Sequence, residues 1–180
     1  MAGKKILLLV CCAPDASYSS EFLKNLGYEV ITYFYNPCIH PLEEYEKRKA
    51  AMETLAEKTG IKNIDNPVYD PERFFEKTKG LEKEPEGGER CNVCFYMRLE
   101  NAAAKAKELG IEELASTLTI SPHKNAELIN ELGKAAAKKY GIKYFESNFK
   151  KNDGFKKSVE LSKKYGLYRQ KYCGCVFSMK

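Results

Sequence analysis

The chain has 180 residues, of which 43% are hydrophobic and 31% are charged, and its formal net charge is +5. Length and hydrophobic content predict one domain, residues 1–180, with a sizeable core. No stretch approaches the roughly 18 to 20 consecutive apolar residues of a membrane span, which excludes an integral membrane protein. The mild positive charge permits a polyanionic partner such as RNA but does not require one.

Strand-like and helix-like segments alternate in the first half of the chain. The apolar run at residues 4–10 is typical of a buried parallel strand. We expect, in chain order, a strand at 4–10, a helix at 19–27, a strand at 29–35, a helix at about 42–59 that Gly60 ends, and a short strand at 61–64. The acidic segment 65–90, which contains glycine and proline, is expected to be irregular.

The second half continues the alternation. Ser121 is a suitable N-cap and Pro122 suits the first helical position, so a helix is expected at 121–141. The other expected elements are a helix at 92–110, strands at 113–120 and 143–147, one more helix in the basic segment that follows, and a cysteine-rich tail at 167–180. This order predicts an α/β fold with a mainly parallel, five-stranded, Rossmann-like sheet and flanking helices.

The start of the chain imitates a secretion signal, because Lys4 and Lys5 precede an apolar run. That run, residues 6–10, is shorter than the apolar region that a signal peptide needs. We therefore expect a cytoplasmic protein.

The chain has seven cysteines, and six of them form three close pairs. A reducing cytosol disfavours disulfides, and metal sites gather cysteines in short clusters where disulfide frameworks spread them. The pairs are Cys11 with Cys12, Cys91 with Cys94, and Cys173 with Cys175.

Two of these pairs are expected at the same edge of the sheet. Cys11, Cys12 and Asp15 follow the first strand, and ligands of open α/β sheets bind beyond the carboxyl ends of the strands. Cys91 and Cys94 begin a crossover helix, whose N-terminus lies at that same edge. The sequence therefore brings together two pairs that lie about 80 residues apart along the chain.

The chemistry of this group has several interpretations. A C-x-x-C at a helix start suits dithiol redox exchange, zinc binding or an iron–sulfur cluster. Six thiolates exceed the needs of one zinc or one four-iron cluster, so either two are idle or two metal centres are present. Asp15 is then a candidate seventh ligand, and its alternative role is to cap the following helix.

Other polar residues carry weaker signals. Cys38 is isolated and is expected to pack at a strand end rather than to bind metal, and His40 is expected to be structural. His123, beside Ser121 and Pro122 at a strand end, is the better candidate for a site residue. Neither G-x-G-x-x-G nor a Walker A sequence follows the first strand, which counts against a nucleotide-activating or sulfur-transferring enzyme.

The last third of the chain is basic and carries interleaved aromatic residues. RNA loops are bound through phosphate contacts together with stacking on aromatic rings, although a solvated lysine-rich face has the same composition. The residues concerned are Lys150, Lys151, Lys156, Lys157, Lys163, Lys164, Arg169 and Lys171, with Phe149, Phe155, Tyr165 and Tyr168.

Five stretches together resemble the QueH family of epoxyqueuosine reductases, the cobalamin-independent type. They are CCAPD, FYNPCIHPLEEYEKR, ERCNVCFYMRLE, TLTISPHK and LYRQKYCGCVFS, in this order. The resemblance covers nearly the whole chain and implies a fold of the adenine-nucleotide α-hydrolase (HUP) superfamily. It implies the last step of queuosine synthesis, in which the epoxide of epoxyqueuosine at the wobble position of tRNA is reduced.

The resemblance also implies a [4Fe-4S] cluster with an additional mononuclear iron. The ligands carried over by motif are Cys11, Cys12, Cys91, Cys94, Cys173 and Cys175, and Asp15 joins them as a metal ligand. Asp15 and His123 are the expected catalytic residues. The implied partners are tRNA carrying epoxyqueuosine and an external electron donor. The alternative interpretation is a zinc-stapled, non-catalytic RNA-binding module.

Overall fold

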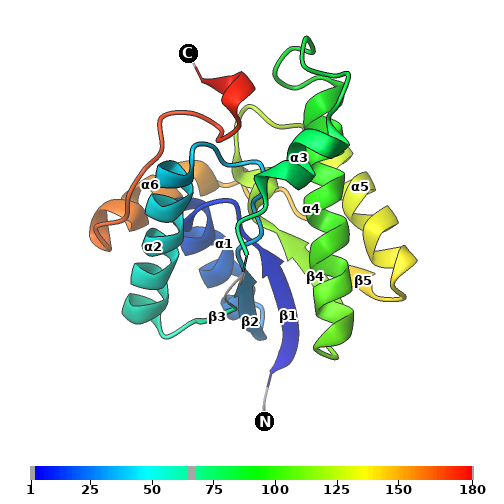
Figure 1. The fold of residues 1–180 in the computed structure, drawn as a ribbon. Helices are drawn as coiled ribbons and strands as arrows, with labels where there is room; N and C mark the ends of the chain where they lie inside the picture. Colours follow the sequence, from blue (N-terminus) through cyan, green and yellow to red (C-terminus); the bar gives the residue numbers. More distant parts are fainter. Residues whose placement is uncertain (1–2, 65–67, 180) are drawn as a thin grey trace.

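The computed structural model describes residues 3–64 and 68–179. Five strands form one parallel sheet in the order β3-β2-β1-β4-β5, so the predicted α/β class and strand number are confirmed (Figure 1). The strands are β1 (Lys4–Leu9), β2 (Tyr28–Tyr33), β3 (Lys62–Ile64), β4 (Glu113–Ser116) and β5 (Lys143–Tyr144).

Helices cover both faces of this sheet. α1 and α2 pack on one face, with α6 against α1, and α4 and α5 pack on the other (Figure 1). The helices are α1 (Ala13–Asn25), α2 (Leu42–Thr59), α3 (Pro71–Lys77), α4 (Glu89–Glu108), α5 (Ala126–Lys139) and α6 (Gly154–Lys164), with 3-10 turns at Thr117–Ile120 and Val176–Ser178. Among the described residues, no helix has the length and apolar character needed to cross a membrane.

The central position of β1 in the sheet explains why its sequence is an apolar run. Ile6 and Leu8 join the core under α1 and α2, whereas Leu7 and Leu9 join the core under α4 and α5. All four are at most 1% exposed. Burial on both faces requires uninterrupted apolar residues rather than the alternation of a half-exposed strand.

Helix α1 begins six residues earlier than expected, at Ala13 rather than Ser19. Pro14 stands in the first turn, where a proline costs no hydrogen bond, and Asp15 is the acidic residue of that turn. These are start signals that outweigh the later serines. Cys12 therefore becomes the N-cap residue, and the first cysteine pair lies directly at a helix N-terminus.

The expected start of α5 at Ser121 is wrong. Residues 121–124 form a turn, and Asn125 caps the helix by accepting a hydrogen bond from the Leu128 N–H at 3.2 Å. Lys150, from a distant segment, donates to the carbonyl oxygens of Thr119, Ser121 and Lys124 at 3.3, 3.2 and 2.8 Å. The carbonyls of Ser121 and Lys124 are thus held outside α5 by a long-range contact that the local sequence does not reveal.

Two expected strands are shorter than predicted. The second half of the expected strand at 113–120 is a 3-10 turn, in which the Ser116 hydroxyl accepts from the Leu118 N–H. β5 ends at Tyr144 because the amide of Asn130, on α5, exchanges two hydrogen bonds with the backbone of Ser147.

The segment predicted to be irregular contains a helix. Residues 65–67 lie outside the described residues, but Pro71–Lys77 forms α3 with Asp70 as its N-cap. An aspartate followed by proline is a helix start signal that the prediction missed.

Candidate metal centre

The site lies where the chain order of the sheet reverses. β1 is flanked by β2 on one side and β4 on the other, and the residues after β1 and β4 meet at the carboxyl edge. The Cys11 N–H donates to Thr117 Oγ1 at 3.3 Å, and the Cys11 sulfur lies 3.3 Å from the same oxygen. The two loops that line this edge are therefore joined through Cys11.

Three candidate ligands gather at the start of α1. The sulfurs of Cys11 and Cys12 are 4.0 Å apart, and Cys11 Sγ is 3.2 Å from Asp15 Oδ2. The ligand atoms of all three lie within 4.8 Å of one another. Since two ligands that bind one metal at about 2.3 Å stand roughly 4 Å apart, this spacing fits a shared metal.

The electrostatics of these three residues favour a cation. Burial raises the pKa of the Asp15 carboxyl well above its usual range, and a negative charge on Cys11 raises it further. A hydrogen bond from the Cys12 thiol lowers the pKa of Cys11. Three acidic groups in one buried space share protons when no cation is present, and a bound metal replaces those protons.

The second cysteine pair opens α4, as predicted. Gly88 precedes the helix, and the Gly87 N–H donates to the Cys91 sulfur at 3.2 Å. Cys94 is 8% exposed, and its thiol lies beside that of Cys38. A hydrogen bond from Cys94 lowers the pKa of Cys38 to about 6, although burial opposes this shift.

Cys38 is therefore closer to the site than the sequence indicated. Its isolation along the chain concealed that the loop after β2 runs past the start of α4. A cysteine directly after a strand of a parallel sheet was the available signal, because strand ends meet at the binding edge.

The third pair arrives from the C-terminal tail. Burial raises the pKa of the Cys173 thiol, and the charges of the nearby Cys38 and Cys175 raise it further. The tail is attached to the loop after β2, where the His40 N–H donates to the Gly174 carbonyl oxygen at 2.8 Å. All three cysteine pairs and Asp15 thus reach one edge of the sheet.

A buried cation lies near several of these cysteines. Arg98 is 3% exposed, donates to Asn36 Oδ1 at 3.1 Å, and has an Nε without a hydrogen-bond partner. In the described parts of the chain it forms no ion pair with a carboxylate. Burial lowers its pKa, but the negative charges of nearby cysteines prevail and raise it; these are Cys38, Cys94, Cys11 and Cys173. A guanidinium enclosed by thiols fits an anionic metal–thiolate group.

The two histidines occupy different surroundings. His123 is exposed on the turn before α5, and its backbone N–H donates to Ser121 Oγ. Its neighbour Lys124 is half-buried and lies near the charges of Cys173, Cys11 and Asp15. His40 is buried, and its Nδ1 accepts from the Val176 N–H at 3.2 Å, which makes it part of the framework that holds the tail.

The comparison with known families decides the identity. The model of the family described as Epoxyqueuosine reductase QueH matches residues 6–180. The chain belongs to the QueH family.

Relatives that bear the QueH name align along nearly the whole chain. The protein from Staphylococcus epidermidis is 47% identical over 97% of this chain and 76% of its own length. The protein from Streptococcus pyogenes is 45% identical over 97% of this chain and 70% of its own, and that from Thermotoga maritima is 38% identical over 97% and 90%. The resemblance read from the five stretches is confirmed.

Solved structures support the fold of this QueH chain. The U34-tRNA thiolase NcsA from Methanococcus maripaludis, solved with its [4Fe-4S] cluster, has a TM-score of 0.62 and 14% identity, covering 100% of this chain and 63% of that one. A predicted subunit of a tRNA methyltransferase from Methanocaldococcus jannaschii has a TM-score of 0.57 and 18% identity, covering 89% and 74%. These similarities support the expected α/β fold with a parallel sheet.

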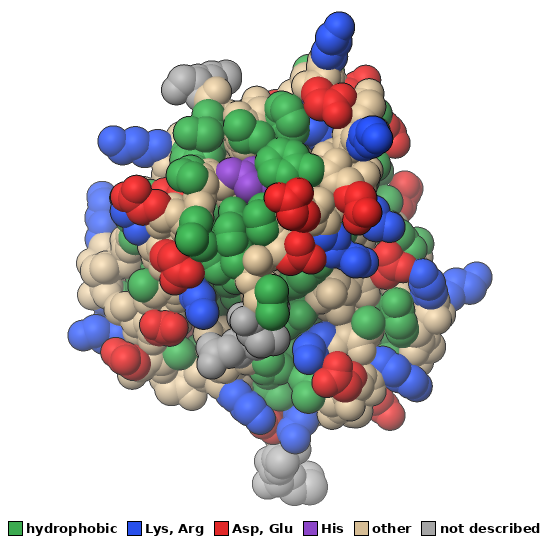
Figure 2. Space-filling model, in the orientation of Figure 1, with side chains coloured by type: hydrophobic (Ala, Val, Ile, Leu, Met, Phe, Trp, Pro, Cys, Tyr) green, Lys and Arg blue, Asp and Glu red, His purple; other side chains and the backbone are tan. Residues whose placement is uncertain are grey.

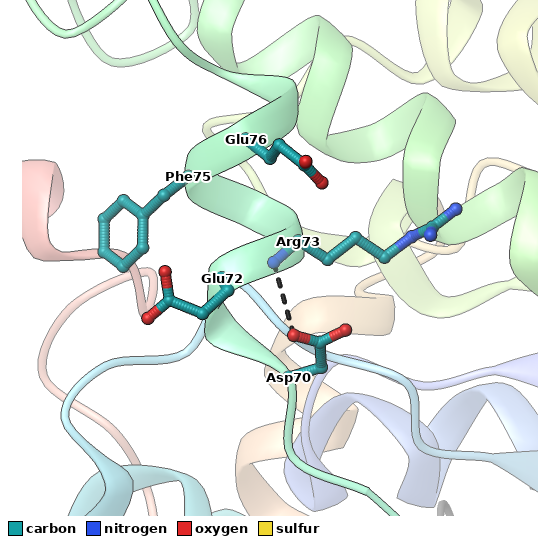
Figure 3. A pocket seen from close by; sticks show the side chains of 5 residues that line it. All are labelled: Asp70, Glu72, Arg73, Phe75 and Glu76. Atoms are coloured by element: carbon teal, nitrogen blue, oxygen red, sulfur yellow. Dashed lines mark hydrogen bonds between the residues drawn. The ribbon is translucent and has the colours of Figure 1, made fainter.

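A separate pocket of about 400 Å³ lies on α3 and contains no cysteine (Figure 3). Asp70, Glu72 and Glu76 line it with Arg73 and Phe75, and the Arg73 N–H donates to Asp70 Oδ1 at 3.4 Å. Three carboxylates repel phosphate groups, so this pocket does not suit the RNA substrate of a QueH protein.

Proposed function

We propose that the chain reduces epoxyqueuosine to queuosine at the wobble position of tRNA, in the cytoplasm. The proposed cofactor is a [4Fe-4S] cluster held by thiolates of the three cysteine pairs, with an additional iron held in part by Asp15. The single observation that supports this proposal is the cluster of Cys11, Cys12 and Asp15 at the carboxyl edge of the sheet, close to the buried guanidinium of Arg98, in a chain of the QueH family.

The reaction requires two electrons and two protons. Removing the epoxide oxygen leaves an alkene and one molecule of water. A thiolate-bound cluster supplies electrons singly when bound, and an adjacent iron polarises a C–O bond. An external donor replaces the electrons, since the sequence shows no dinucleotide-binding loop.

Residues around the site offer a ligand and hydrogen-bond donors suited to binding the epoxide. Asp15 supplies a carboxylate oxygen beside the thiols of Cys11 and Cys12. Lys124 and His123 lie together on the turn that Lys150 holds, and they are the proposed N–H donors for the oxygen that leaves. The fixed turn orients these donors before substrate arrives, which lowers the cost of stabilising the developing charge.

A direct assay tests the proposed function. Protein purified without oxygen is expected to be brown and to contain roughly five irons per chain. With dithionite and tRNA that carries epoxyqueuosine, digestion and mass spectrometry of the nucleosides should show queuosine. Colourless protein that holds zinc and leaves epoxyqueuosine unchanged would instead support the zinc-stapled RNA-binding module.

The structure narrows the set of basic and aromatic residues available to RNA. The three hydrogen bonds of Lys150 to backbone carbonyls occupy its ammonium group. Phe149 is 3% exposed and packs edge-on against Phe22 at 5.5 Å, so it cannot stack on a base. Lys156 and Lys157, in contrast, are exposed on α6. They remain candidates for phosphate contacts, as do the exposed Lys163 and Lys164 on the same helix.

Reversing the charge of both residues, with Lys156→Glu and Lys157→Glu, is expected to weaken tRNA binding about tenfold or more. Each lost phosphate contact also reduces the slope of log affinity against log salt by about one, so the double variant should lose about two. Filter binding at several salt concentrations measures both quantities, and iron content should not change.

A matched control is the same reversal at Lys107 and Lys138. Both are exposed, in the last turns of α4 and α5, at the edge of the sheet opposite the cysteines. If both double variants lose the same tRNA affinity, α6 contributes only general attraction by positive charge and no specific phosphate contact.

A further inference from the structure

The tail that carries Cys173 and Cys175 is held by a buried arginine of α2. Arg48 is 2% exposed. Its Nη1 donates to the carbonyl oxygen of Cys173 at 2.7 Å, and its Nη2 donates to that of Tyr172 at 3.0 Å. The two arms of one guanidinium thus hold the peptide units on both sides of the Cys173 Cα.

Arg48 is itself held in place by Glu44. Its Nε donates to Glu44 Oε1 at 2.9 Å, one turn away on α2. The Tyr168 hydroxyl donates to the same carboxylate, with oxygen distances of 2.8 and 3.0 Å. Because Glu44 is 8% exposed, this pair forms a nearly buried network that holds the tail at Tyr168 and again at Tyr172 and Cys173.

The residue between the two cysteines leaves no space for adjustment. Gly174 has a φ of 143°, a conformation that side chains disfavour. A Cβ at this position would lie 3.1 Å from Arg48 Nη1 and 3.2 Å from Ile39 Cγ1. The tail therefore lies directly on the guanidinium, and its register along the chain is fixed there.

The other candidate ligands need no such support. Cys11 and Cys12 stand between β1 and α1, and Cys91 and Cys94 are in the first turns of α4, so regular structure places all four. The tail has only the short turn Val176–Ser178, and its apolar residues Val176 and Met179 are 42% and 50% exposed. Figure 2 shows hydrophobic side chains gathered on the face near the C-terminus. Hydrogen bonds with His40 and ring contacts of Phe177 hold the residues that follow in the tail, whereas Arg48 holds the backbone at Cys173 itself.

Stability alone is a poor explanation for this network. A buried ion pair often adds little to stability relative to apolar residues of the same volume, whereas it does fix geometry. The planar fork of arginine matches two carbonyl oxygens at once, which an ammonium cannot do.

We propose that Arg48, fixed by Glu44 and Tyr168, is the positioning residue that presents Cys173 and Cys175 to the metal centre. Its guanidinium contacts the backbone of the ligand segment. The inference rests on the proposed function for the identity of the centre, but the contact between Arg48 and the tail does not.

The test compares Arg48→Met with Lys47→Met. Lys47 is the preceding residue on α2 and forms an exposed pair with Glu43 at 3.2 Å, so it is a matched control with the same helical spacing. Anaerobic metal-loaded protein is treated with iodoacetamide, and peptide mass spectrometry follows each cysteine separately. In Arg48→Met, Cys173 and Cys175 should be alkylated about tenfold faster or more, because two charge-assisted hydrogen bonds are lost. Cys91 and Cys94 should remain protected, and Lys47→Met should match the wild type.

Two conservative variants separate positioning from general destabilisation. Arg48→Lys should behave like Arg48→Met, since one ammonium cannot replace the fork. Tyr168→Phe removes a single hydroxyl and should accelerate alkylation of the tail by a smaller factor while the chain remains folded. Parallel acceleration at every cysteine, or unchanged protection of Cys173 and Cys175, would overturn the inference.

A metal-free arm distinguishes this inference from the proposed function. In metal-free protein, trypsin should cut after Lys171 faster in Arg48→Met than in Lys47→Met, because the tail opens more often. If all cysteines of the wild-type protein are freely alkylated under anaerobic, metal-loading conditions, both the metal centre and the role of Arg48 in presenting its ligands are refuted. If the cysteines of the wild type resist alkylation and Cys173 and Cys175 resist it equally in Arg48→Met, only the role of Arg48 is refuted and the metal centre stands.

Discussion

Replacing Cys94 by serine is expected to remove nearly all bound iron, whereas replacing its neighbour Cys38 by serine should leave most of it. Cys94 is in the first turns of α4, where backbone N–H groups and the helix dipole stabilise a thiolate. The low pKa of Cys38 depends on the hydrogen bond that the Cys94 thiol donates. When a metal binds Cys94, that bond is lost, and Cys38 returns to a protonated packing role.

Iron and acid-labile sulfide per chain measure this difference in anaerobically purified protein. The two thiols lie side by side and are both nearly buried, so the pair controls for damage to packing. Equal loss of iron in both variants would make Cys38 a further ligand. Normal iron in Cys94→Ser would remove the C-x-x-C pair from the ligand set.

Asp15→Ala should separate the two proposed metal centres. Iron content is expected to fall by about one per chain while the visible spectrum of the cluster persists. Turnover should fall by about 100-fold or more, because the iron that polarises the C–O bond is lost while electron delivery survives. Iron analysis, spectroscopy and the nucleoside assay on one preparation provide the three measurements.

Asp15→Asn is the companion variant, because it retains the shape of the side chain without its charge. If Asp15 only complements the positive end of α1, both variants should keep full iron and turnover and lose about 0.3 to 1 kcal/mol of stability. If the whole cluster disappears with Asp15, the carboxylate and the thiols serve one centre.

Much of the fold follows from signals that act over a few residues. The uninterrupted apolar run of β1 and the bounds of α2 were predictable, the latter because Gly60 ends the helix with a φ of 71°. The start of α5 was not predictable in this way. It depends on Lys150, which reaches the carbonyl oxygen of Ser121 from 29 residues away.

The residues of the candidate site also fall into a predictable and an unpredictable group. The places of Cys11, Cys12, Cys91 and Cys94 follow from the rule that strand ends and helix starts share one edge of the sheet. The places of Cys38 and Arg48 do not, because they depend on how an irregular loop and the tail meet. Arg48 looks like an ordinary member of a charged helix until its partner 125 residues later is known.

The chain order of the cysteines has a consequence for biogenesis. Cys11 and Cys12 leave the ribosome first, and Cys91 and Cys94 follow, each pair next to the strand or helix that places it. Cys173 and Cys175 are synthesised last and reach the sheet only by closing a loop onto α2. In a nascent chain the proposed metal site therefore stays open until Arg48 captures the tail. If that site is loaded before closure, a chain that closes without metal has to release the tail before it can mature.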